Sequence, residues 1–145
     1  MNNDLTSAKE LLVNNGYTCV LFKDGNEFHS FDRGVKPLID FLESGKDFDG
    51  FYAADKTVGA GAAHIYVLLG VKALWANIIS QSGKEILEKN NIQIFFGKQV
   101  PYIINRSGDG VCPIESSVKD IKNSNEALSA IKEKLKKLNS AKQKD

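Results

Sequence analysis

The densest group of chemically active residue types lies in residues 105–115, NRSGDGVCPIE. Pro113 is typical of the first residue of a helix, where a backbone N–H has no partner to lose. Cys112 is then the N-cap and Glu115 the third helical residue, whose carboxylate can reach back to free N–H groups of its own helix. A helix N-terminus favours the thiolate form of a cysteine, more so with Arg106 nearby. The string therefore offers a nucleophile, although a Gly-rich turn holding a small, inert cysteine explains it equally well.

The enzymatic hypothesis makes Cys112 the nucleophile of a group-transfer or hydrolytic reaction, with Glu115 or Asp109 handling protons. Arg106 would stabilise the negative charge that develops. A thiolate nucleophile usually works with a base such as histidine. The chain has two histidines, and the sequence places neither beside the cysteine. This hypothesis is therefore the alternative to the binding hypothesis below.

A second group of residues follows a buried-looking strand at residues 50–54. A helix rich in small residues is expected at 58–69, and polar residues precede it. Asp55 could cap this helix, Lys56 could hold an anion, and Gly59 would let a ligand approach the free N–H groups. The string has neither the Walker A spacing nor G-x-G-x-x-G. Close packing of the helix on the sheet explains its small residues equally well.

Two further strands are expected at residues 72–79 and 92–96, each followed by polar residues. Because the carboxyl ends of parallel strands collect ligands, we expect these ends and the string at 105–115 to surround one site. The binding hypothesis assigns ligand contacts to Asp55, Lys56, Gly59, Ser80, Asn105 and Arg106. It describes a metal-free protein of unknown physiological role that holds a nucleotide-like or phosphorylated small molecule. A purely structural or partner-binding role is the third alternative.

Hydrophobic periodicity predicts alternating helices and strands. Helices are expected at residues 4–14, 37–43, 58–69, 83–90 and 115–138, the last one broken near 123–125. Strands are expected at 18–22, 27–29, 50–54, 72–79 and 92–96, and Asp24-Gly25 is a strong hairpin signal. The pattern predicts an α/β fold, a three-layer α/β/α sandwich with a mixed sheet. A single domain would span residues 1–139, with a solvated tail at 140–145.

Composition narrows the classes of protein. The chain has 145 residues, of which 26% are charged and 42% hydrophobic, and a net charge of +1. We expect a cytoplasmic protein without a membrane span, because there is no leader pattern and the apolar runs are short. Residues 132–145 hold six Lys against two acidic residues, so the rest of the chain carries about −3. This distribution of charge argues against a nucleic-acid partner. It does not decide whether the protein forms an oligomer.

Metal ligands are sparse in the sequence. The two histidines and two cysteines stand apart from one another, and no Cys-x-x-Cys pair occurs. His64 falls in the middle of a predicted helix, where a packed histidine is more common than a ligand. We therefore expect no bound metal and no cofactor.

Several strings along the chain carry a resemblance to a known family. They are GVKPL at 34–38, ADKTVG at 54–59, IS at 79–80, VPYIINR at 100–106 and CPIE at 112–115. From about Asp4 to Leu138 the chain resembles the bacterial family known as domain of unknown function 1893. That resemblance implies a cytidine deaminase-like fold and implies no activity.

Zinc deaminases need His-x-Glu at one helix start and Pro-Cys-x-x-Cys at the next. The corresponding positions here, 55–57 and 80–83, supply neither the zinc ligands nor the glutamate, so the sequence argues against zinc-dependent deamination. The chain also has Ala60 where the resemblance leads us to expect a lysine. Anion affinity at this helix would then be weaker or would depend on Lys56 alone.

Overall fold

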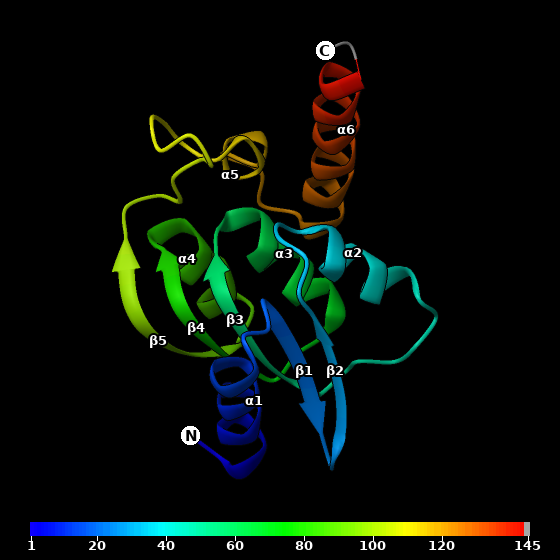
Figure 1. Ribbon diagram of the computed structural model, residues 1–145, viewed down its shortest axis with the longest axis vertical. Helices are drawn as coiled ribbons and strands as arrows, with labels where there is room; N and C mark the ends of the chain where they lie inside the picture. Colours follow the sequence, from blue (N-terminus) through cyan, green and yellow to red (C-terminus); the bar gives the residue numbers. More distant parts are fainter. Residues whose placement is uncertain (144–145) are drawn as a thin grey trace.

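The structure, a computed structural model, describes residues 1–143, with side chains up to residue 140. Its centre is a five-stranded mixed sheet in the order β2-β1-β3-β4-β5 (Figure 1). The strands are β1 (Cys19–Lys23), β2 (Asn26–Ser30), β3 (Tyr52–Val58), β4 (Ala73–Ser80) and β5 (Gln93–Val100). β1 pairs antiparallel with β2 and β3, whereas β3, β4 and β5 are parallel. The predicted mixed sheet is therefore confirmed.

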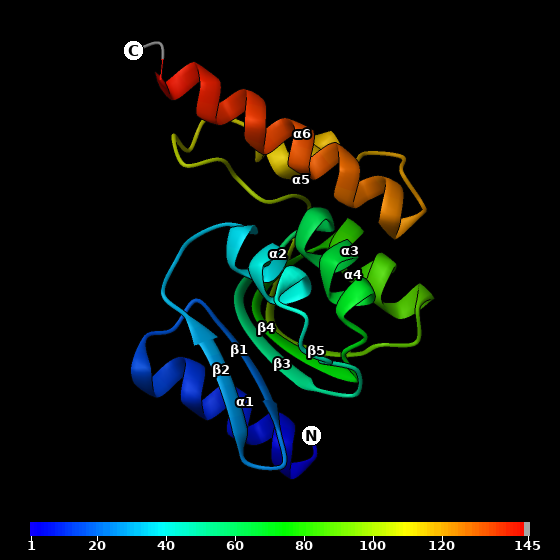
Figure 2. The same cartoon turned by 90° about the vertical axis from the view of Figure 1, so that its right-hand side faces the viewer.

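Helices cover both faces of this sheet (Figure 2). They are α1 (Asn3–Asn15), α2 (Lys36–Glu43), α3 (Ala60–Leu69), α4 (Gln81–Lys89), α5 (Pro113–Ser117) and α6 (Ser124–Gln143). α1 packs on one face against β1, β3 and β4, and α2, α3 and α4 lie on the other. α5 and α6 pack outside α3, above the carboxyl ends of the parallel strands.

The first helix shows how the sequence defines its own boundaries. The Asn2 side chain accepts a hydrogen bond from the Leu5 N–H at 2.8 Å, which caps the helix. Gly16 ends it with a φ of 69°, a left-handed conformation that glycine adopts without strain. Leu5, Ala8 and Leu12 form the buried stripe against the sheet. The helix therefore forms where its apolar spacing predicts.

β3 and β5 are longer than the sequence predicts. Residues 55–57, expected as a loop, belong to β3, because Asp55 pairs with Cys19 on one side and Ala76 on the other. Residues 97–99, also expected as a loop, belong to β5. A Cβ on Gly97 would lie 2.9 Å from the Asn77 carbonyl oxygen, so glycine permits the close approach of β4. The carboxyl edge of the sheet therefore lies at Val58, Ser80 and Val100.

The C-terminal helical region is two helices with a connection at residues 118–123, close to the expected break. His64 on α3 fixes this connection, since its Nδ1 lies 3.0 Å from Ser124 Oγ and its Nε2 lies 3.1 Å from the Ile121 carbonyl oxygen. The packed interpretation of His64 is thereby confirmed. α6 continues to Gln143, so residues 140–143 of the expected tail are helical, and residues 144–145 lie outside the described residues. Within residues 1–143, no helix is both long and apolar enough to cross a membrane.

Candidate functional site

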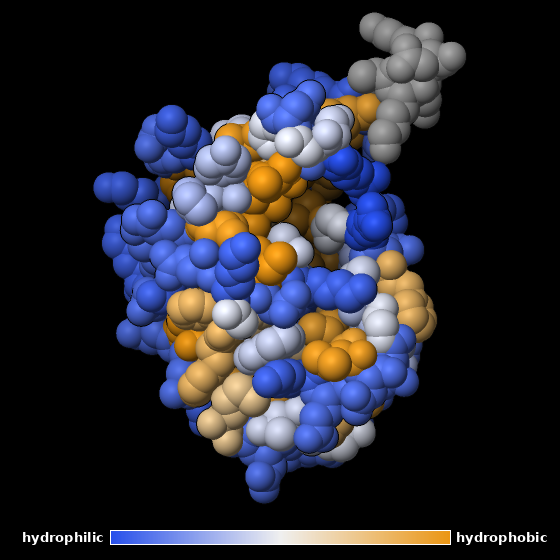
Figure 3. Space-filling model, turned by 60° about the vertical axis from the view of Figure 1, so that its left-hand side comes forward, coloured by the Kyte–Doolittle hydropathy of each residue, from blue (hydrophilic) through white to orange (hydrophobic). Residues whose placement is uncertain are grey.

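A cavity of about 400 Å³ lies at the carboxyl edge of the sheet. Its walls come from the start of β1, the β2–α2 loop, the end of β3, the first turn of α3 and the segment between β5 and α5. Figure 3 shows a hollow on this side of the molecule, with hydrophobic surface inside it and along one rim and hydrophilic surface along the other rim. This volume is typical of a small-molecule site.

Three cationic side chains line the cavity, namely Arg33, Lys56 and Arg106. The chain has only two arginines, and both are in this lining. All three residues are exposed. Among the ion pairs of the residues that the structure describes, none involves these three side chains. The cavity therefore presents positive charge that an anion could neutralise.

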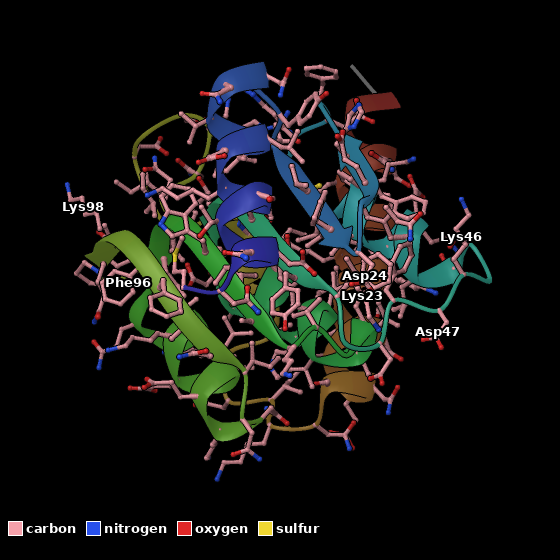
Figure 4. The ribbon with its side chains drawn as sticks, turned by 90° about the horizontal axis from the view of Figure 1, so that it is seen from below. Lys23, Asp24, Lys46, Asp47, Phe96 and Lys98 are labelled. Atoms are coloured by element: carbon pink, nitrogen blue, oxygen red, sulfur yellow. The ribbon has the colours of Figure 1, made fainter. Side chains whose placement is uncertain are left out.

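Other charged residues lie at the opposite end of the sheet. Figure 4 views the molecule from that end, with Lys23 and Asp24 at the hairpin turn and Lys46 and Asp47 in the loop after α2. There, cations and carboxylates alternate along the chain. The cavity differs because its cations come from three separate segments.

The first turn of α3 forms another wall of the cavity, through Gly61 and Ala62. N–H groups in a first helical turn have no partner within the helix, and they give this end of the helix a positive potential. A Cβ on Gly61 would lie 2.6 Å from Ile114 Cγ2, and a Cβ on Gly59 would lie 3.0 Å from Ile103 Cγ1. Close packing against the segment above therefore accounts for both glycines.

Glu115 holds this wall together instead of capping its own helix, so the expected capping role is wrong. Its side chain is buried, and its Oε1 accepts hydrogen bonds from Ser82 Oγ at 2.9 Å and from the Ala60 N–H at 3.4 Å. Its Oε2 accepts one from the Ile103 N–H. The carboxylate thus joins α5 to the starts of α3 and α4 and to the segment after β5. Both of its oxygens already have protein partners, which argues against a role in proton transfer.

Asp55 lies buried in the lining of the cavity. The expected role as a helix cap is wrong, because β3 continues past this residue. Its carboxylate accepts hydrogen bonds from the Tyr66 hydroxyl at 2.6 Å and from the Thr57 N–H at 3.1 Å. Burial raises the pKa of Asp55 to about 7. Burial and the neighbouring Asp55 also raise the pKa of Cys19, a second thiol in the lining.

Cys112 lines the cavity, is half-buried and stands at the N-cap of α5, as expected. Its side chain makes no capping hydrogen bond. The two histidines have other partners, since His64 is bound at the α6 connection and His29 stacks on Tyr17 with ring centroids 3.8 Å apart. Cys112 therefore lacks the histidine base that thiol catalysis usually needs.

Two predicted contacts lie elsewhere. Among the residues that the structure describes, the cavity lining includes Asp55, Lys56, Gly59, Arg106, Cys112 and Glu115 but leaves out Ser80 and Asn105. Ser80 is buried and caps α4, its Oγ accepting from the Gly83 N–H at 3.1 Å. The Asn105 side chain donates to Asp109 at 2.9 Å and closes the exposed turn. The sequence analysis did not include Arg33. The one available signal was that Arg33 and Arg106 are the two arginines of the chain.

The described residues contain no group of three histidine, cysteine, aspartate or glutamate side chains that could hold a metal ion. The expectation of a metal-free protein stays a prediction. Elemental analysis of protein purified without chelators tests it, and about one zinc per chain would contradict it.

Comparison with known families matches residues 7–135 to a domain of unknown function, DUF1893. The match covers most of the chain, and the chain belongs to this family, as the resemblance predicted. It is also similar to the crystal structure of a DUF1893 family protein from Thermotoga maritima, with a TM-score of 0.83 and 22% identity over 94% of this chain and 91% of that chain. At this identity the likeness shows the fold alone. Comparison with curated proteins gave no match.

Proposed function

We propose that this member of the DUF1893 family binds an anionic small molecule, nucleotide-like or phosphorylated, in the cavity at the carboxyl edge of its sheet, without a resident metal. One observation carries the proposal. Both arginines of the chain and Lys56 line the same cavity, and none of the three is in an ion pair among the described residues.

The three cations approach the cavity from different segments. Arg33 comes from the β2–α2 loop, Lys56 from β3 and Arg106 from the segment between β5 and α5. A guanidinium group donates two parallel hydrogen bonds to a phosphate or carboxylate, which fixes the orientation of the anion. A phosphate group would thus be held from several sides.

We also propose that the domain is cytidine deaminase-like in fold. The mixed sheet with helices on both faces supports this assignment. The chain departs from the zinc deaminases in chemistry, because its helix starts after β3 and β4 lack their ligand residues. The proposal concerns the architecture, and the activity does not follow from it.

The alternative, an enzyme with Cys112 as nucleophile, has one observation in its favour: the thiol lines the same cavity. Two observations weigh against it. The oxygens of Glu115 are occupied by three protein donors. Both histidines are engaged away from the thiol. Binding is therefore the function that the geometry supports better.

Titration calorimetry with inorganic phosphate tests the proposal. Arg106→Ala and Arg33→Ala should each weaken phosphate binding about ten-fold or more, because one charge-assisted hydrogen bond contributes about 1.5–3 kcal/mol. Lys136→Ala is the matched control, since Lys136 is an exposed cation on α6. Its phosphate affinity should equal that of the wild type. The proposal is wrong if the wild type binds no phosphate, or if all three variants bind it like the wild type.

A further inference from the structure

We propose that the anion is carried on an aromatic ring rather than on a sugar or polyol, so that an aryl phosphate is the class of ligand that this cavity prefers. This inference rests on the proposed function. It concerns the apolar side chains that line the same cavity as the three cations.

Four larger apolar side chains also line the cavity, and two of them are closely packed. Ile103 and Ile114 lie against the first turn of α3, where Cβ atoms on Gly59 and Gly61 would be only 3.0 and 2.6 Å from their side chains. Val35, buried at the start of α2, adds to the lining. The Ile103 N–H is already bound to Glu115. Sugar hydroxyls placed against these side chains would lose hydrogen bonds to water without gaining protein partners. Burial of an apolar ring in the same place is favourable, because it removes apolar surface from water.

Ile104 gives the second, independent observation. Its side chain lines the cavity, yet it is 59% exposed. A bridge to Val111 holds its backbone in place, so its position does not depend on side-chain burial. It lies two residues from Arg106, which lines the same cavity. When Arg106 binds the anionic group of a ligand, the rest of that ligand therefore lies near the exposed side chain of Ile104.

The lining thus has two kinds of side chain, a cationic part made of Arg33, Lys56 and Arg106 and an apolar part made of Val35, Ile103, Ile104 and Ile114. Phosphate alone would use only the first. Phenyl phosphate would use both and would cover Ile104, and glycerol 3-phosphate would bring hydroxyls to side chains that cannot bind them. The inference therefore predicts the order of affinity among these three probes.

Calorimetry with inorganic phosphate, phenyl phosphate and glycerol 3-phosphate tests this order. Phenyl phosphate should bind about ten-fold more tightly than glycerol 3-phosphate, since a ring buries several apolar carbons. Ile104→Ser should remove most of that preference and leave the affinity for inorganic phosphate within about two-fold. Because Ile104 is already exposed, the variant should fold. Val13→Ser is the matched control, as Val13 is 61% exposed on α1.

The outcomes separate the two proposals. If phosphate binds and all three probes bind equally, the inference is overturned and the proposed function stands. If Ile104→Ser and Val13→Ser give the same preference, the inference is also overturned, because the apolar part does not contact the ring. If no probe binds the wild type, the proposed function itself fails.

Discussion

Replacing Glu115 by glutamine tests whether this carboxylate is a structural link. The side chain accepts hydrogen bonds from the Ser82 hydroxyl and from the N–H groups of Ala60 and Ile103. Glutamine has the same size, but only one of its two terminal atoms can accept. Its NH₂ group would face a donor, so at least one buried donor would lose its partner.

The expected loss of stability follows from the number of donors that lose their partner. Leaving a buried donor unsatisfied costs about 1–3 kcal/mol, and the remaining bonds lose the extra strength that a charged acceptor gives them. We therefore expect Glu115→Gln to lower the free energy of unfolding by about 2–4 kcal/mol. Urea denaturation followed by circular dichroism measures it, and the m-value should stay the same because the surface exposed on unfolding does not change.

Glu10→Gln is the control for this experiment, because Glu10 is an exposed carboxylate on α1. Its effect should stay within about 0.5 kcal/mol. If Glu115→Gln also falls within that range, the carboxylate is not a structural link. The case against Glu115 as a proton-transfer group would then be lost as well.

Three further predictions concern packing, reactivity and pH. Gly61→Ala should lower the free energy of unfolding by about 1–3 kcal/mol in urea, because its Cβ would lie 2.6 Å from Ile114 Cγ2; unchanged stability would contradict the close packing. Iodoacetamide should modify half-buried Cys112 in the folded protein. It should modify Cys19 only after unfolding, because Cys19 is buried and its pKa is raised. Mass spectrometry of the peptides measures both sites, and modification of Cys19 before Cys112 in the folded protein would contradict the prediction. The raised pKa of Asp55, about 7 against 3.8, means that this group takes up a proton on folding in that window, so its contribution to the free energy of unfolding should fall as pH rises from 4 to 8. Asp55→Asn should flatten this slope, and an unchanged slope would refute the assignment.

The order of elements could be predicted because each carries a local signal. The hairpin is an example: Asp24 and Gly25 have φ values of 49° and 83°, the left-handed conformations that their residue types favour in a tight turn. The ends of β3 and β5 could not be predicted. The polar residues 55–57 and 97–99 read as loops locally, and only pairing with neighbouring strands keeps them extended.

The site was predictable to a similar degree. Lys56, Arg106 and Cys112 could be placed together because strand ends and a helix start converge in this topology, and all three line the cavity. The role of Glu115 could not be predicted from capping patterns, since its partners are up to 55 residues away along the chain. Arg33 was missed because it stands in a loop without any motif.

The two carboxylates in the lining have hydrogen-bond partners other than its cations. Asp55 is satisfied by Tyr66 and Thr57, and Glu115 by donors from three segments. Neither pairs with a cation of the lining in the described residues. The carboxylates therefore position the walls, while the cations stay available to a ligand. Since Glu115 also accepts a hydrogen bond from the Ile103 N–H, next to Ile104, loss of its charge should disturb Ile103 and Ile104 before it disturbs Arg33 on the β2–α2 loop.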